Sequence, residues 1–504
     1  MPDILKLNQL PPARLFLHLF WITLLIKLLL AAILPLTGDE AYFFLWGRHP
    51  ALGYYDHPPM IGWWLTALMW AGDALWWLRM PSVLLSHAIA LGIVWLLRER
   101  DESLAWLAGS LYLVAPLSLL GVLITTDTPV ILFSFFTVFA FDRAVRGRHF
   151  GWFVAAGLLL GLAMLSKYFA GLLALALVAY LLVATDRRRV AAGLLLVTLV
   201  SAALFSINIY WNYSHCLDNF LFNFITRNRD IAPWYNPLLY LLTLLYAVTP
   251  PVAWYLLKGR GPGAVGDSLV RLFLVLNLVP YGLLGLLSFA KLIGLHWLLG
   301  FYAFSFILLG LLRGANALRG AIRFNLWFSL LHLLLVLVIL LMPWQQLPLS
   351  AEQQKKIIDA TRQGWVWEAV RPHAQGKELF THSYAAAGEM AYFSKRPVGV
   401  FGEGSFHARE DDKHTRFDRL DGKDFLIFLS SHRPAETYAP FFDQIEYRTI
   451  DVHGAEFEIV IGSGFNYPVY RERVLKRIDQ RFYQIPEGWP LAACYFKARY
   501  GFPQ

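Results

Sequence analysis

Long apolar runs constrain this 504-residue chain more than any other feature. The runs LHLFWITLLIKLLLAAIL, PSVLLSHAIALGIVWLL and FSLLHLLLVLVILLM each approach the roughly 20 residues that a helix needs to cross about 30 Å of hydrocarbon. Hydrophobic residues make up 57% of the chain and charged residues only 16%, a balance that soluble domains rarely reach. The first run has no convincing small-residue cleavage site, so we expect a retained helix. The sequence therefore predicts a polytopic α-helical membrane protein.

Lysine and arginine residues occur in short clusters between the apolar runs, as is typical of cytoplasmic loops. With Lys6 and Arg14 in a cytoplasmic N-terminus, this alternation predicts about eleven transmembrane helices and a C-terminus on the outer side. The other clusters expected inside are Arg98/Arg100, Arg143/Arg146/Arg148, Arg187/Arg188/Arg189, Lys258/Arg260 and Arg313/Arg319/Arg323. The net charge of +9 is thus explained by loops that face anionic membrane lipids, and no nucleic-acid partner is expected.

The composition changes after Met342. Residues 343–504 carry most of the acidic residues and no run long enough to span a membrane. The segments KDFLIFLS and AEFEIVIGS are typical of strands, and SYAAAGEMAYFS of a short helix between strand-like ELFTH and PVGVF. We therefore predict a membrane domain at 1–345, with interfacial helices in its first outer loop at 35–80, and a small periplasmic α/β domain at 346–504.

Acidic and basic residues near helix ends gather on the predicted outer face. They are Asp39, Glu40, Asp56, His57, Asp127, Lys167, Arg227, Arg229, Lys291 and His296. Acids and bases that converge at one membrane face suit a reaction on a membrane-held substrate. Structural alternatives remain open: Asp127 before Thr128 and Pro129 could be a helix N-cap, Lys167 and Lys291 could extend to lipid headgroups, and His57 could be a turn residue.

Two further features leave alternatives open. Cys216 and Cys494 both fall on the predicted outer side, where they could form a disulfide or stay as unpaired thiols. Asp56, His57 and His296 could form a divalent metal site, although they come from separate loops. No other cofactor is expected.

Several segments resemble the polytopic glycosyltransferases with the GT-C fold, specifically the bacterial relatives of protein O-mannosyltransferases and lipid A aminoarabinose transferases. The segments are DEAYFFLW at 39–46, YYDHPPMIGW at 54–63, TTDTP at 125–129, LSKYFAGLL at 165–173, WNYSHCLDNFLFNF at 211–224 and KLIGLHW at 291–297. The resemblance covers residues 10–345. It implies a multi-pass protein of the bacterial inner membrane that transfers a sugar, at the periplasmic face, from polyprenyl (undecaprenyl) phosphate to lipid A, another glycolipid or a protein.

The resemblance also implies roles for individual residues. Asp39 matches the acid of the first outer loop, which contacts the acceptor and can act as base, and Asp127 matches the acid of the second outer loop. Asp56 and His57 stand where aminoarabinose transferases have Glu-Lys before two prolines, so the lysine is replaced here. We expect the catalytic residues to be Asp39, Glu40 and Asp127, the donor-phosphate ligands Lys167, Lys291, His296 and Arg227, and the acceptor or sugar ligands Tyr55, Asp56 and His57.

A secondary transporter or lipid flippase is the alternative from another functional class. Transporters usually show internal repeats and broken helices with polar residues near the membrane midplane. Here the polar residues cluster at one face, no repeat of fixed period is present, and a sizeable outer domain follows. The sequence therefore favours a glycosyltransferase.

Overall fold

Two units, each built from three separate stretches of sequence, make up the fold. The computed structural model describes residues 10–147, 149–228, 233–258, 266–405, 407, 409–490 and 492–503. Lys6, Arg148, Arg229 and Arg260, which the sequence analysis placed in loops, lie outside these residues. The helical unit comprises Met1–Ile33, Gly72–Ile207 and Asp230–Leu341, and the sheet unit comprises Leu34–Ala71, Asn208–Arg229 and Met342–Gln504.

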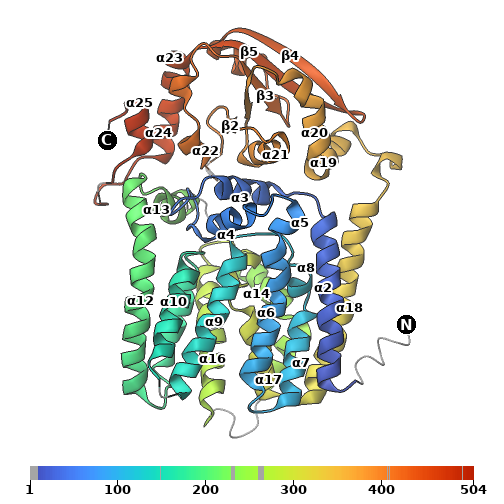
Figure 1. Ribbon diagram of the computed structural model, residues 1–504, viewed down its shortest axis with the longest axis vertical. Helices are drawn as coiled ribbons and strands as arrows, with labels where there is room; N and C mark the ends of the chain where they lie inside the picture. The colour runs from blue at the N-terminus through green and yellow to red at the C-terminus, as the bar shows by residue number, and fades with distance from the viewer. Residues whose placement is uncertain are drawn as a thin grey trace. The chain divides into compact units, whose positions relative to one another are not determined.

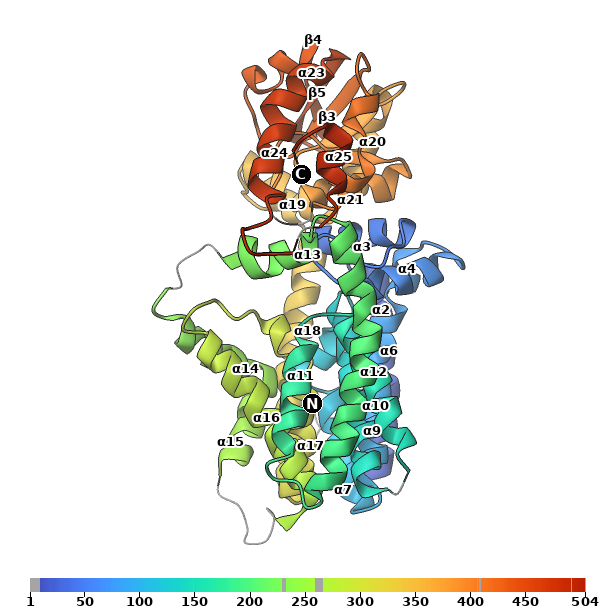
Figure 2. The same ribbon diagram turned by 90° about the vertical axis from the view of Figure 1, so that its left-hand side faces the viewer.

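The helical unit consists of apolar helices that run roughly side by side (Figure 1). Its helices are α2 (Pro12–Ile33), α5 (Leu75–Leu78), α6 (Met80–Leu97), α7 (Glu102–Leu113), α8 (Pro116–Leu120), α9 (Asp127–Arg146), α10 (Gly151–Met164), α11 (Ala170–Tyr180), α12 (Arg187–Ser214), α14 (Asn236–Val248), α15 (Pro250–Leu257), α16 (Ser268–Leu287), α17 (Tyr302–Leu312) and α18 (Ala315–Leu341). Among the described residues, six helices are long and apolar enough to cross a membrane. The pair α14 and α15, bent by 98° at one edge of the unit (Figure 2), would make a seventh. The predicted polytopic helical class is confirmed, and the number of eleven spans stays a prediction.

Close packing and one buried cation tie the first helices of this unit together. A Cβ atom on Gly109 of α7 would lie 2.8 Å from Val94 and 2.9 Å from Phe16, so a small residue is needed where α2, α6 and α7 meet. Lys27, halfway along α2, is buried and donates hydrogen bonds to Ser82 O (3.0 Å), Ser86 Oγ (2.8 Å) and Ser118 O (3.0 Å). Since each ammonium hydrogen has an acceptor, this charge is accommodated as a link between helices.

The sheet unit has five strands in the order β2-β1-β3-β5-β4. Strands β1 (Glu378–Thr381), β2 (Val398–Val400) and β3 (Phe425–Leu429) are parallel, whereas β4 (Phe442–Val452) and β5 (Ala455–Phe465) form an antiparallel hairpin on β3. The turn of the hairpin has positive φ at both His453 and Gly454, which matches the right-handed twist of the strands. The predicted strands, and the predicted helix between β1 and β2, are confirmed.

Helices cover both faces of this sheet. Phe425, Ile427 and Leu429 of β3 belong to one apolar core, and Leu426 and Phe428 belong to a second core on the opposite face. This explains why β3 is apolar at every position. The helices of the unit are α3 (Gly38–Arg48), α4 (Met60–Met69), α13 (Asp218–Phe220), α19 (Ala351–Thr361), α20 (Gln363–Val370), α21 (Tyr384–Ser394), α22 (Asp411–His414), α23 (Tyr467–Tyr470), α24 (Lys476–Phe482) and α25 (Tyr495–Tyr500).

Two segments from the first half of the chain are part of the sheet unit. Helix α3 packs closely on α21, because a Cβ atom on Gly38 would lie 2.6 Å from the Cβ of Ala385, and one on Gly388 would lie 2.8 Å from the carbonyl carbon of Ala41. The unit thus contains α3 and α4 from the predicted interfacial region at 35–80, together with 208–229. The domain boundary at 345 stays a prediction, since the observed units are discontinuous in sequence.

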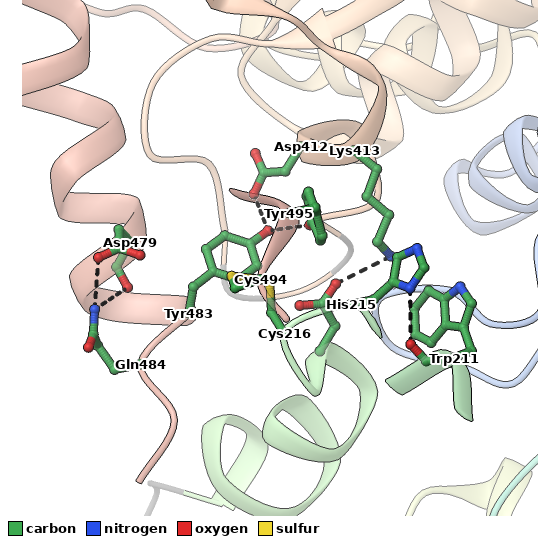
Figure 3. The surroundings of a disulfide bond; sticks show 11 residues. Trp211, His215, Cys216, Asp412, Lys413, Asp479, Tyr483, Gln484, Cys494 and Tyr495 are labelled. Atoms are coloured by element: carbon green, nitrogen blue, oxygen red, sulfur yellow. Dashed lines mark hydrogen bonds and ion pairs between the residues drawn. A yellow bond between two sulfur atoms is a disulfide. The ribbon is translucent and has the colours of Figure 1, made fainter. Parts of the chain in front are cut away.

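A disulfide bond between Cys216 and Cys494 joins residues separated by 278 positions within the sheet unit (Figure 3). Two backbone hydrogen bonds accompany it, from Cys216 N to Ala493 O (2.8 Å) and from Ala493 N to Tyr213 O (3.0 Å). The bond therefore fastens the stretch 208–229 to the C-terminal segment, and it answers the question that the sequence left open.

Candidate active site

The YYDHPP loop lies between α3 and α4 and is held from two sides. Its own turn is closed by a hydrogen bond from Tyr54 N to His57 O (2.9 Å). The side-chain amide of Asn219 donates to Tyr54 O (2.9 Å), and that of Asn223 donates to Asp56 O (3.1 Å). Both asparagines come from the WNYSHCLDNFLFNF segment, so two of the segments singled out in the sequence meet here.

The buried Asp56 and the half-buried His57 form a pair in this loop. The Nδ1 atom of His57 lies 3.1 Å from Oδ2 of Asp56, and the hydroxyl of Tyr42 donates to Oδ1 of Asp56 (3.2 Å). Burial on its own raises the pKa of Asp56, but the neighbouring His57 and these hydrogen bonds outweigh burial and lower the pKa below its ordinary value. The ionised form of Asp56 is therefore favoured, and its carboxylate lies next to the His57 imidazole.

The adjacent carboxylates Asp39 and Glu40 lie in different environments. Glu40 is 2% exposed and completes a capping box with Thr37, whose backbone N–H donates to Glu40 Oε2 (3.3 Å). Asp39, in the same first turn of α3, is more accessible and accepts a hydrogen bond from the hydroxyl of Tyr384 (3.3 Å). The geometry thus favours Asp39 over Glu40 as the group that meets a substrate.

Two tyrosines connect Asp39 with Asp56. The ring of Tyr384, from α21, lies 5.1 Å from the ring of Tyr42, which donates to Asp56. Burial and the negative charge of Asp39 raise the pKa of Tyr384 to about 12, so its hydroxyl stays protonated and can donate. Sequence reasoning missed Tyr384, because nothing in SYAAAGEMAYFS links it to a residue 345 positions earlier.

Arg227 and His407 carry charge or potential charge close to these acids. Burial lowers the pKa of Arg227, and Asp56 acts in the opposite direction. The pKa of His407 is lowered by burial and by Arg227, while Asp56 and Asp39 oppose this effect. Arg227 thus interacts electrostatically with Asp56 and with His407.

Glu410 is a second residue that sequence reasoning missed. Its carboxylate is 3% exposed and accepts hydrogen bonds from Tyr55 N (2.7 Å) and from Lys413 Nζ (2.6 Å). Lys413 Nζ also lies 3.4 Å from Asp218, in the stretch that holds the YYDHPP loop. The ring of Tyr55 is 1% exposed in the core of the unit, so Tyr55 supports the loop and offers no surface to a sugar. In the sequence, only the high density of charged residues in REDDKH at 409–414 could have pointed to Glu410.

In the helical unit, Asp127 and Lys167 form a buried ion pair. The Lys167 Nζ atom lies 2.7 Å from Asp127 Oδ1, and both side chains are at most 10% exposed. Asp127 is the first residue of α9 and Thr126 is the N-cap, so the capping alternative for Asp127 is wrong. The Lys167 ammonium is paired with a buried carboxylate, so the side chain does not extend to the surface.

Lys291 and His296 lie in one loop of the helical unit, after α16. Trp297 of this loop packs on Phe169, with ring centroids 4.2 Å apart, and Phe169 follows Lys167 closely in sequence. The KLIGLHW and LSKYFAGLL segments therefore meet. His296 is exposed and Lys291 is half-buried.

The predicted site residues thus fall into two groups. The sheet unit gathers Asp39, Glu40, Tyr55, Asp56, His57 and Arg227, and the helical unit contains Asp127, Lys167, Lys291 and His296. In the described part of the chain, no three His, Cys, Asp or Glu side chains are grouped so as to hold a metal ion. The structure therefore does not support the metal site of Asp56, His57 and His296 that the sequence left open.

Comparison with known proteins adds two sequence matches. Residues 56–211 match the family described as dolichyl-phosphate-mannose-protein mannosyltransferase. The chain is 30% identical over 202 residues to the lipid A galacturonosyltransferase RgtD of Rhizobium johnstonii, a match that covers 39% of this chain and 41% of the relative. The matched region therefore spans about two-fifths of the length of that relative.

Solved structures extend the likeness to most of the chain. ArnT from Cupriavidus metallidurans in the apo state is similar with a TM-score of 0.57 at 15% identity, covering 88% of this chain and 97% of ArnT. The same protein bound to undecaprenyl phosphate gives a TM-score of 0.59 at 14% identity, with the same coverage. These likenesses show that the chain has the fold that the sequence motifs indicated.

Proposed function

We propose that this chain, which has the fold of the GT-C glycosyltransferase superfamily, is a membrane glycosyltransferase that moves a sugar from a polyprenyl phosphate to an envelope acceptor. The observation that carries the proposal is the accessible Asp39 carboxylate, held by Tyr384 in the same unit as the Asp56–His57 pair and Arg227. ArnT was solved with undecaprenyl phosphate, which supports that donor class. RgtD acts on lipid A, which supports lipid A or another glycolipid as acceptor.

The proposed reaction exchanges one bond at the sugar's anomeric carbon. The bond to the donor phosphate breaks, a bond to the acceptor oxygen forms, and polyprenyl phosphate leaves with both bonding electrons. Where the acceptor is a hydroxyl, Asp39 accepts its proton. Where it is a phosphate, Asp39 orients it. The phosphate that leaves gains negative charge, and Arg227, Lys291 and His296 are the cations proposed to stabilise it. Lys167 is proposed to act through its ion pair with Asp127.

Two alternatives differ in what they predict. A protein O-glycosyltransferase with the same donor is favoured by the family match over residues 56–211. A transporter or flippase is favoured by the 98° bend between α14 and α15, because transporters use broken helices. Purified protein in liposomes distinguishes them. We expect polyprenyl phosphate to be released only when donor and glycolipid acceptor are both present. Solute movement without donor consumption would favour transport.

The orientation in the membrane is also proposed: a cytoplasmic N-terminus and a periplasmic sheet unit in a bacterial inner membrane. The cationic loop clusters support it, and so does the Cys216–Cys494 bond, since disulfides persist in oxidising compartments. A reporter enzyme that works only in the periplasm should be active when fused after Met342 and inactive when fused near Arg188. The opposite pattern would place Asp39 and Asp56 in the cytoplasm and contradict the proposed site.

A further inference from the structure

Two hollows in the sheet unit share three residues and lie beside the network that holds the YYDHPP loop. The first, of about 390 Å³, is lined by His215, Lys413 and Arg499 among others. The second, of about 350 Å³, extends toward Arg416 and Arg419. Both are lined by His49, Glu410 and His414. We name these two hollows together the α22 groove, and each of them has room for a small ligand.

Five cations and three carboxylates line the α22 groove, and three of the cations, Lys413, Arg416 and Lys423, each pair with a carboxylate, which leaves Arg419 and Arg499. The guanidinium of Arg499 donates to the backbone carbonyls of Asp412 (2.6 Å), Lys413 (2.9 Å) and Thr415 (3.1 Å), and carbonyl partners leave its charge uncompensated. Arg419 is exposed, and no hydrogen bond or ion pair of its side chain is present among the described residues. Burial and the neighbouring Asp412 raise the pKa of Asp411 to about 8, which removes one negative charge from the lining near neutral pH.

Histidine side chains occupy the junction between the two hollows. The rings of His49 and His414 are stacked, with centroids 4.2 Å apart. His414 Nε2 lies 3.7 Å from Glu410, and its side chain is 40% exposed. Figure 3 shows Lys413 pointing toward His215 and Trp211, and all three residues line the first hollow. Imidazole nitrogens donate to and accept from hydroxyls, so the junction suits a ligand that carries hydroxyls as well as an anion.

We infer that the α22 groove binds an anionic saccharide, the phosphorylated headgroup of the acceptor glycolipid. Arg419 in one hollow and Arg499 in the other would each supply charge for a phosphate, and His49 and His414, which line both hollows, would meet sugar hydroxyls. A phosphate group matches the planar fork of arginine, and this favours an anion over a neutral sugar. The inference rests on the proposed function in one respect, namely that the saccharide belongs to the acceptor.

Direct binding tests the groove without any transfer reaction. The full-length protein in detergent is titrated with glucosamine 1-phosphate, with glucosamine, and with inorganic phosphate. We expect glucosamine 1-phosphate to bind more tightly than either of the others, and Arg419→Gln and His414→Gln each to weaken it about tenfold. Arg448→Gln is the matched control, because Arg448 is an exposed cation on β4 that pairs with Glu446 and lines neither hollow.

The outcomes separate this inference from the proposed function. Equal affinity for inorganic phosphate and glucosamine 1-phosphate would overturn the saccharide part, and unchanged affinity in well-folded Arg419→Gln and His414→Gln would overturn the groove. Binding that is lost in these variants, in a protein that transfers no sugar, would support the groove and contradict the proposed function. With phosphorylated lipid A as acceptor, we expect Arg419→Gln to raise KM about tenfold and to leave KM for the donor unchanged.

Discussion

Glycosyl transfer by the Asp39→Asn variant is expected to fall by about 10²- to 10⁴-fold, the contribution typical of a positioned general base. The replacement is isosteric, and its amide oxygen can still accept the hydrogen bond from Tyr384. Folding should therefore be unchanged, because Asp39 is exposed and the helix cap is made by Thr37 and Glu40. The measurement is turnover of a polyprenyl-phosphate sugar by purified protein, together with the melting temperature of each variant.

Two matched variants make this result specific. Glu40→Gln keeps the shape of the capping residue and should retain most activity. Tyr384→Phe removes one hydrogen bond to Asp39 and should lower kcat by about fivefold, the value of a typical hydrogen bond of about 1 kcal/mol, while donor binding stays unchanged. Near-normal turnover in a well-folded Asp39→Asn variant would remove Asp39 from the chemistry. A larger loss in Glu40→Gln than in Asp39→Asn would move the base to Glu40.

The second large effect is expected on stability. Lys167→Met should destabilise the protein by about 3–5 kcal/mol, because it leaves the Asp127 carboxylate buried without its partner. The double variant Asp127→Asn/Lys167→Met should recover much of that loss, since no unpaired charge remains. Unfolding of the four proteins in detergent gives the coupling between the two residues.

Lys291→Met is the control for this prediction. Lys291 lies half-buried in a loop of the same unit, so its loss should change stability little. If Lys167 instead acts as a direct ligand of the donor phosphate, Lys167→Met should melt like the wild type but bind a polyprenyl-phosphate analogue more weakly. That outcome would contradict the structural role that the ion pair indicates.

Local patterns in the sequence predicted the elements well. Continuous apolar runs indicated the long helices, and KDFLIFLS predicted a strand, which the structure shows to be β3, buried at every position. The YYDHPP and WNYSHCLDNFLFNF segments both carried the family resemblance, and the structure joins them through Asn219 and Asn223. The spacing of Thr37 and Glu40 also carried a signal that could have been used, because Thr-x-x-Glu before an apolar run is a capping box.

Contacts between distant segments could not be predicted in this way. Tyr384 is hydrogen-bonded to Asp39, 345 positions earlier, and Glu410 to Tyr55, 355 positions earlier. Neither Tyr384 nor Glu410 lies in a motif that is recognisable from local sequence. The burial of the Tyr55 ring and the pairing of Cys216 with Cys494 depend on the same tertiary packing. The sequence therefore indicated which segments carry chemistry, and the fold decided which side chains in them face a substrate.

Mass spectrometry of envelope lipids tests the central claim, transfer of a sugar to an envelope glycolipid, most directly. The comparison is between a wild-type strain, a strain that lacks this chain, and the deletion strain complemented with wild-type protein or with Asp39→Asn. We predict that the deletion shifts one glycolipid to a mass lower by a single sugar residue, and that only the wild-type protein restores it. Identical envelope lipids in all four strains, under conditions in which the chain is produced, would contradict both the proposed acceptor and the proposed transfer reaction.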